Sequence, residues 1–431
     1  MTPIVVGFIG LAGLFGLVTF GMPIGFAMGL VGFLGFAYLT TLHAAVVKIG
    51  VIGFDLTTNY AIGTIPLFLF MAHILFASGI GRDLYDFAAH WLGRRRGGLA
   101  MATIGASAGF ASVSASSLAT TATMGLVALP EMRKHNYDVS LAAGSTAAGG
   151  TIGSLIPPSG MFIIYGILTE TSIGKMFAAG IIPGILLAVF YMATIAIMCR
   201  IRPELGPRGP KYTFTEKLRS LGRTGEVIAL FALVMGGIMF GWFTPTEAGA
   251  VGAFGAVAIA SAGGRLDWPS LKEAAYSTLK TTGMIFGILF GALTFNAFAT
   301  VSTIPLNIVN FVSGSGFAPM VVLLMILGVY FLLGMVLDAS AMMTLTVPLF
   351  FPLITSLGID AVLFGVLVVR MTEIALITPP VGMNVYVLSG VAPDIPLNKI
   401  FKGTLPFVVA DILHVALLLA FPAIALWLPG L

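Results

Sequence analysis

The sequence has little charge. Only 9% of its 431 residues are Asp, Glu, Lys or Arg, whereas 58% are hydrophobic. Soluble domains are about one quarter charged, so this composition excludes an ordinary soluble protein and predicts a polytopic membrane protein. The net charge of +4 is small and the basic residues lie in short stretches, which argues against nucleic-acid binding. The single cysteine excludes an intrachain disulfide and a cysteine-based metal cluster.

Motifs for nucleotides and transition metals are missing as well. No Walker loop is present, so the sequence predicts no ATP-driven motor. The five histidines show no H-E-x-x-H or other ligand spacing, so we expect no transition metal and no organic cofactor. The N-terminus is apolar from residue 3 and has no positive n-region, which favours a first membrane helix over a signal peptide.

One long polar stretch lies near the middle of the chain, at Cys199–Arg223. It holds seven Lys or Arg residues against two Glu, and such an excess predicts a cytoplasmic location. We therefore expect a cytoplasmic linker at 199–224 between a first membrane repeat, 1–198, and a second, 225–431.

The two halves look like copies of each other. A shift of 222 positions places Asp138 on Asp360 and the pair Pro157-Pro158 on the pair Pro379-Pro380. A single offset that holds over most of each half indicates an internal duplication.

Charge and length predict how the copies are oriented. Residues 97–132 are too many for one span and too few for two, and basic residues flank both ends, so we expect a re-entrant hairpin that opens to the cytoplasm. Its counterpart, at about 317–357, has no basic flanks and should open to the outside. The prediction is an all-α membrane protein with two inverted repeats. The other predicted parts are broken helices at 137–169 and 360–393 and scaffold helices at 3–78 and 226–262.

The two Pro-Pro pairs predict helix breaks within spans. Proline removes a backbone donor and clashes with the preceding turn, so each pair should unwind its helix. Freed carbonyls can coordinate a cation, and a restarted half-helix offers a positive N-terminus to an anion. The hairpin turns beside the breaks are rich in Ser and Thr, which suits a sodium site. The alternative is that these hydroxyls bond back to their own helices or allow close packing.

Two charges lie inside the second broken helix. Arg370 and Glu373 are three residues apart on one helix, so they can pair with each other as a structural ion pair. Alternatively, Arg370 meets a substrate carboxylate, for which a guanidinium is well shaped. Asn384, just after the second break, is a further candidate for substrate contact.

Several segments closely resemble one transporter family. The stretches "IGSLIPPSGMFIIYG", "PTEAGAV", "LGMVLDASAMM" and "ITPPVGMNVYVLSG" are similar to those of the large membrane subunit of tripartite ATP-independent periplasmic (TRAP) transporters, DctM type. The resemblance implies an elevator-type transport domain in the bacterial inner membrane, with Na+ as the coupling ion. It also implies a small membrane subunit of the DctQ type and a periplasmic binding protein of the DctP type that delivers an organic acid.

The same resemblance assigns site residues by position. The first sodium site would use Ser114, Ser116, Gly153, Ser154 and Ile156. The second sodium site would use Asp338, Ser340, Thr378 and Gly382. Substrate contacts would come from Ser117, Pro158, Arg370 and Asn384. The family often has "SGS" at the first turn, where this chain has Ser114-Ala115-Ser116.

Three other functions compete with the leading one. A stand-alone sodium–carboxylate symporter of related fold would need no partner proteins. An intramembrane enzyme would need a nucleophile with a base or a metal cluster, and the sequence shows neither. A non-transporting scaffold is disfavoured because duplicated broken helices are costly without a site.

Overall fold

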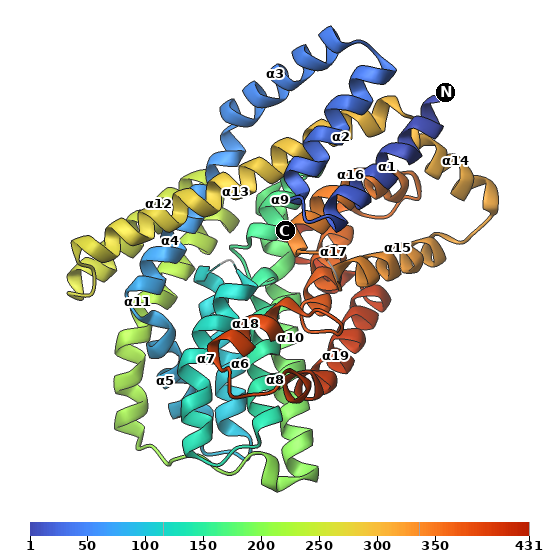
Figure 1. Cartoon of the computed structure of the whole chain (residues 1–431). Coiled ribbons are helices and arrows are strands. Elements are labelled where there is room, and N and C mark those ends of the chain that lie inside the picture. Colours follow the sequence, from blue (N-terminus) through green and yellow to red (C-terminus); the bar gives the residue numbers. More distant parts are fainter. Residues whose placement is uncertain (115, 336, 431) are drawn as a thin grey trace.

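The computed structural model describes residues 1–114, 116–335 and 337–430, and the fold is entirely helical (Figure 1). Apart from one isolated bridge between Arg96 and Arg208, these ranges contain no paired strands. The all-α prediction is confirmed.

The described residues contain five helices that are long and apolar enough to cross a membrane, or six if one bent pair counts as a single span. The five are Tyr60–Ala77, Ile173–Ile201, Trp268–Val301, Ala339–Ser356 and Leu397–Ala420. Further apolar helices of 10–17 residues include α1 (Pro3–Thr19), α2 (Ile24–Leu39) and α15 (Pro319–Gly334). This length and composition fit a multi-pass membrane protein.

A long helix, α13 (Trp268–Val301), crosses the molecule and packs along α2 and α4 (Thr64–Ala77), while α12 (Pro245–Ala262) also packs on α4 (Figure 1). Below this layer lies a bundle formed by both halves of the chain. Its first-half helices are α6 (Gly98–Ser114), α7 (Ser117–Lys134), α8 (Val139–Thr151), α9 (Gly160–Thr169) and α10 (Ile173–Ile201). Its second-half helices are α16 (Ala339–Ser356), α17 (Ala361–Ala375), α18 (Met383–Val391) and α19 (Leu397–Ala420).

The series of elements in the first half recurs in the second. The helix pair α6 and α7 covers the segment of the first predicted hairpin, and α15 and α16 cover the second. The first residues of α7 and α16 are 222 positions apart, and so are Asp138 and Asp360, which cap α8 and α17 through their carboxylates. The structure therefore has the same local elements at the spacing that the sequence indicates.

The two broken helices run antiparallel. Arg133, beside the start of α8, forms a 2.7 Å salt bridge with Asp394, beyond the end of α18. At the other end, the Tyr165 hydroxyl in α9 donates to the Ala361 carbonyl at the start of α17, at 2.6 Å. Each broken helix thus ends where the other begins, which is the relation that an inverted repeat requires. The orientation of the halves across a membrane stays a prediction.

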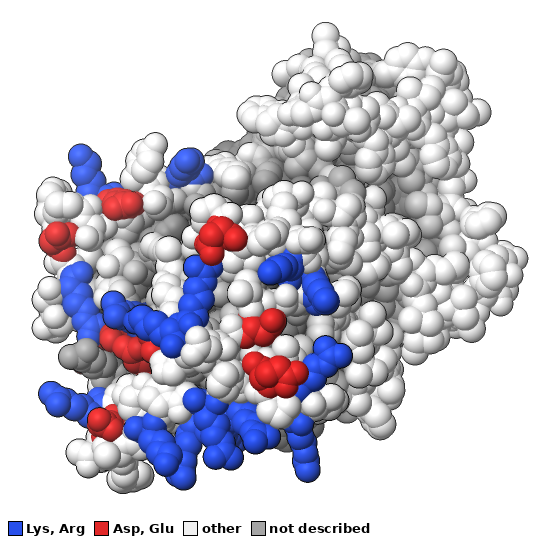
Figure 2. All heavy atoms as spheres, turned by 60° about the horizontal axis from the view of Figure 1, so that its bottom comes forward, with Lys and Arg blue, Asp and Glu red and all other residues white. Residues whose placement is uncertain are grey.

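Charged side chains gather on one face of the molecule (Figure 2). The polar linker is attached there by backbone hydrogen bonds from Gly97 N to Gly206 O (2.8 Å), from Gly209 N to Gly93 O (3.0 Å) and from Asp138 N to Leu205 O (3.0 Å). The linker therefore lies against the ends of α6 and α8, while its cytoplasmic location remains a prediction.

Helices α8 and α19 approach closely at two glycines. A methyl group added to Gly144 would overlap the backbone of Gly403, and one added to Gly403 would overlap the Ser140 carbonyl. Because backbone cannot give way as a side chain does, we expect Gly144→Ala to lower the stability by at least about 1–3 kcal/mol. Gly328→Ala, with nothing within 4 Å of the added methyl, is the matched control and should not destabilise. Thermal unfolding of the purified protein in detergent compares them; equal midpoints for both variants would contradict this packing.

Candidate functional site

The turn between α6 and α7 lies directly against the first helix break. The Ser117 and Ser154 hydroxyls are 2.9 Å apart. The Gly153 backbone passes so close that an added methyl group would lie 3.3 Å from the Ser116 carbonyl. Ser114, Ser117 and Ser154 are all buried. The structure thus brings together the serines predicted at the first turn and those predicted at the first break.

The first break is held by a serine that sequence reasoning missed. The short 3-10 turn η2 (Ile152–Ser154) follows α8, and Pro157-Pro158 then stops the helical hydrogen bonding. Ser159 replaces the lost bonds: its hydroxyl donates to the Ser154 carbonyl at 2.5 Å and accepts from the Phe162 amide at 3.4 Å, which caps α9. A serine directly before a restarted helix is the signal that identifies this role.

The hydroxyls of the first turn bond largely to one another and to backbone. Ser114 Oγ lies 2.8 Å from Thr120 Oγ1, and Thr120 donates to the Ser116 carbonyl at 2.9 Å. Ser112 donates to Gly109 O and Thr123 to Ala119 O, so for these two residues the back-bonding alternative holds. Ala115, where the turn departs from the family pattern, lies outside the described residues.

Glu373, from the second half of the chain, reaches this first-half site. Ser117 Oγ donates to Glu373 Oε2 at 2.6 Å, and Glu373 is 1% exposed. The site therefore contains a buried carboxylate beside the serines and the freed backbone of the break.

The pairing of Arg370 with Glu373, one of the two alternatives for Arg370, does not occur among the salt bridges of the described residues. Arg370 instead donates from Nη2 to Asp411 Oδ1 in α19 at 2.5 Å, with both side chains fully buried. The Tyr191 hydroxyl in α10 donates to the same carboxylate oxygen at 2.6 Å. Sequence reasoning passed over Asp411, although an acidic residue inside the apolar stretch 404–428 is itself a signal of function or pairing.

The four residues of the second predicted sodium site fall into two pairs, and no hydrogen bond connects the two pairs among the residues that the structure describes. Asp338 accepts from the Ser340 amide at 3.1 Å and caps α16, and the Ser340 hydroxyl lies 3.9 Å from Met161 Sδ in α9. Thr378 donates back to Ile374 O at 2.7 Å, and an added methyl group at Gly382, which has φ +61°, would lie 3.3 Å from the Thr378 carbonyl. The four residues thus form two separate pairs.

The two breaks differ in exposure. Pro157 and Pro158 are buried, whereas Pro379 and Pro380 are exposed. Asp338 at the second turn is likewise exposed, whereas Ser114 and Ser117 at the first are not. The first turn and break are therefore closed together, and the second are open.

Asn384 of the second break also packs into the first-half site. Its Nδ2 donates to the Ala147 carbonyl at 3.2 Å, and its Oδ1 is buried with no hydrogen-bond partner in the described chain. A methyl group at Gly150 would lie 2.9 Å from the Ser117 carbonyl and 3.1 Å from Asn384 Nδ2. The structure therefore brings Asn384 near Ser117, around Gly150.

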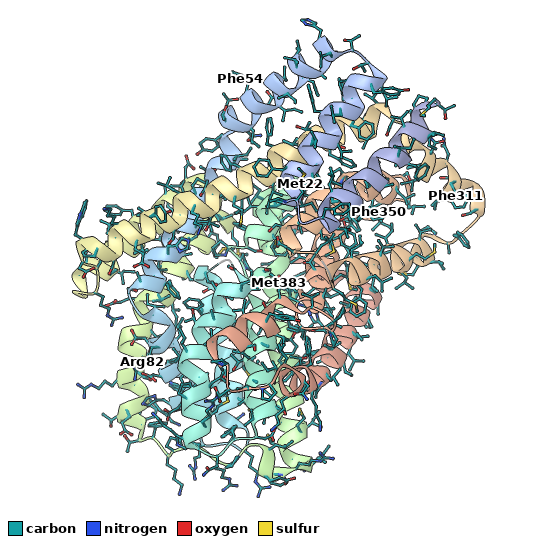
Figure 3. All side chains as sticks on the ribbon, in the orientation of Figure 1. Met22, Phe54, Arg82, Phe311, Phe350 and Met383 are labelled. Carbon is teal, nitrogen blue, oxygen red and sulfur yellow. The ribbon has the colours of Figure 1, made fainter. Side chains whose placement is uncertain are left out.

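The other predicted contacts lie elsewhere. Pro158 lines a small pocket with Met71, Ser112 and Phe231, on the side of α11 (Phe214–Met239). Ile156 borders an apolar cavity lined by α6, α10 and α11 and by Leu84 of α5 (Ile80–Leu92). Met383, the first residue of α18 and the neighbour of the predicted contact Asn384, lies near the middle of the molecule (Figure 3).

Comparison with known proteins gives a consistent result. The family model described as "Tripartite ATP-independent periplasmic transporter, DctM component" matches residues 11–424. The C4-dicarboxylate TRAP transporter large permease protein DctM of Pseudomonas aeruginosa is 35% identical over 378 residues, which are 88% of each chain. The sialic acid TRAP transporter large permease protein SiaM of Vibrio cholerae is 33% identical over 424 residues, 97% of each chain.

A solved structure shares the fold. The YdaH transporter of Alcanivorax borkumensis superimposes with a TM-score of 0.62 over 88% of this chain and 87% of its own, at 14% sequence identity. At that identity the likeness concerns the fold alone.

Proposed function

Since the chain belongs to the DctM family of TRAP transporter large permeases, we propose that it imports an organic acid by coupling to sodium. Membership makes it a multi-pass membrane transporter component, so the intramembrane-enzyme alternative is dropped. The substrate class is supported by the relatives named for C4-dicarboxylates and for sialic acid, both of which are organic acids. A dicarboxylate or a sugar acid is therefore the proposed cargo.

The main support for sodium coupling is the Glu373 carboxylate, which lies beside the first turn and the first break. Hard cations prefer oxygen ligands, and this place offers a carboxylate, the Ser117 and Ser154 hydroxyls and the unwound backbone around Gly153. Formally, Glu373 and Asp411 carry two negative charges against one positive charge on Arg370. A bound monovalent cation would balance the remaining negative charge in a buried setting, where an unbalanced charge is costly.

The same charge count supports an order of binding. A formally negative site repels an organic anion, and a sodium ion bound first would remove that repulsion. Each ligand would then raise the affinity for the other, which is the thermodynamic content of coupling. Asn384, whose Nδ2 lies beside Gly150 as the Ser117 carbonyl does and whose buried Oδ1 has no partner in the described chain, would lie at the substrate side of this site.

We further propose an elevator movement in the bacterial inner membrane, with the linker on the cytoplasmic side. Each half would then supply one turn and one break, and the closed first pair and open second pair would exchange roles during transport. A small membrane subunit and a periplasmic binding protein complete the proposed transporter.

Uptake into proteoliposomes tests the proposal. The permease is reconstituted with its small subunit, and radiolabelled succinate or sialic acid is offered with the cognate binding protein under an inward gradient of sodium or of potassium. We expect uptake at least tenfold above background with sodium only. Equal uptake in the two gradients would refute sodium coupling. Equal uptake with and without the binding protein would instead favour the stand-alone symporter.

A further inference from the structure

Two chains of hydrogen bonds connect the first break to the second half of the protein. In one chain, the Ser154 hydroxyl at the end of η2 contacts the Ser117 hydroxyl, which contacts Glu373. In the other, the Thr151 hydroxyl at the end of α8 lies 2.9 Å from the Tyr191 hydroxyl, which contacts Asp411. The break is thus attached at the end of α8 and at the end of η2.

The two chains of hydrogen bonds meet on α17. Glu373 belongs to this helix, and so does Arg370, whose guanidinium binds the same Asp411 oxygen that accepts from Tyr191. Positions three apart on a helix lie on neighbouring parts of its surface. One short segment of α17 is therefore connected both to Thr151 at the end of α8 and to Ser154 at the end of η2.

Hydrogen counting gives the second chain a direction. A carboxylate is the stronger acceptor, so the single Tyr191 hydrogen goes to Asp411 at 2.6 Å. Thr151 donates its single hydrogen to the Ala148 carbonyl at 2.7 Å and can donate to Tyr191, 2.9 Å away, only by sharing that hydrogen. By the same count Ser117 donates to Glu373, and Ser154 donates to Ser117.

This direction leaves oxygen lone pairs free at the break. Because the hydrogens of Thr151 and Ser154 are used in these contacts, the remaining lone pairs of the two hydroxyls are available to other ligands. A cation binds the oxygen side of a hydroxyl. The chains therefore favour the hydroxyl orientation that a sodium site needs.

From these contacts we infer that Tyr191 and Asp411 are positioning residues of the first sodium site, acting through Thr151. The inference rests on the proposed sodium coupling. It gives a reason for burying a tyrosine beside a charged pair at this place. Tyr191, which is bound to Asp411, fixes Thr151 at the end of α8, where the first break begins.

Direct binding of 22Na+ to the purified permease, with its small subunit, tests this role. Tyr191→Phe removes only the bridging hydroxyl, and Thr151→Val removes the hydroxyl at the break. Losing a hydrogen bond that orients a charged or ligating group should weaken sodium affinity about tenfold in each variant. The number of sodium ions bound per protein at saturation should not change. Tyr85→Phe is the matched control, because the Tyr85 hydroxyl is buried without a hydrogen-bond partner in the described residues.

The outcomes separate the inference from the function on which it rests. A wild-type protein that binds no sodium refutes the proposed coupling. If the wild type binds sodium and either folded variant keeps an affinity within twofold of it, the positioning role is wrong. A purely structural role would lower the thermal midpoint measured without sodium and leave the sodium affinity unchanged, and that result also overturns the inference.

Discussion

Replacing Asp411 with alanine is expected to lower the free energy of unfolding by about 3–5 kcal/mol, because it leaves the Arg370 guanidinium buried without its counter-charge. Arg370 is fully buried, and its Nε and Nη1 have no hydrogen-bond partner in the described structure. The single bond from Nη2 to Asp411 is therefore its only charged contact among the salt bridges of the described chain. Denaturant or thermal unfolding in detergent measures the loss.

Two further variants separate charge from packing. The double variant Arg370→Met with Asp411→Leu replaces the pair by apolar side chains of similar length, so it should recover most of the lost stability. Asp394→Ala breaks the salt bridge to Arg133. The side chains of Asp394 and Arg133 are 62% and 42% exposed, so the free energy of unfolding should fall by less than about 1 kcal/mol. An Asp411→Ala variant as stable as Asp394→Ala would show that the buried pair is not needed to keep Arg370 in place.

The order of the elements could be predicted from the sequence because its signals are local. Asp138 and Asp360 each cap the helix that follows them, and each Pro-Pro pair stops a helix whatever surrounds it. Such signals act within a few residues, so they survive in both halves at a spacing of 222 positions. Basic flanks add a predicted orientation across the membrane.

The partners of the charged residues could not be predicted in the same way. Sequence spacing shows that Arg370 and Glu373 can reach each other, but not what packs against their helix. In the fold, Arg370 meets Asp411, and Glu373 meets Ser117, which is 256 positions away. Contacts of that range depend on how α7, α10 and α19 surround α17, and pairs three apart on a helix contribute only a few tenths of a kcal/mol.

The sequence also could not predict that the first turn is hydrogen-bonded to its break while the second, within the part of the chain that the structure describes, is not. The repeat predicts equivalent sodium sites at the two turns, yet Ser117 touches its break while Asp338 and Ser340 share no hydrogen bond with Thr378 or Gly382 in the described residues. A repeated motif cannot specify which copy is closed, because that depends on the conformation adopted. Two copies in unequal states are what alternating access by an inverted repeat would require.

Replacing Glu373 with glutamine is expected to weaken sodium affinity about 100-fold at one site. Glutamine keeps the length of the side chain, and its amide oxygen can still accept from Ser117, so the geometry of the turn should survive. The formal negative charge is lost. Two unit charges 4 Å apart interact by about 4 kcal/mol at an effective dielectric constant of 20, and about 1.4 kcal/mol changes an affinity tenfold. An expected change of about 100-fold therefore uses only part of that energy, since the amide oxygen remains a ligand.

Binding of 22Na+ and uptake at saturating sodium should respond differently to this change. If Glu373 acts by its charge, Glu373→Gln needs far more sodium for half-maximal uptake, whereas Glu273→Gln, on an exposed position of α13, behaves as the wild type. If Glu373 only fixes the turn through Ser117, then Glu373→Gln, whose amide oxygen still accepts from Ser117, should keep a sodium affinity close to that of the wild type. A Glu373→Gln protein with wild-type sodium affinity would therefore refute the contribution of the Glu373 charge to an ion site at the first break.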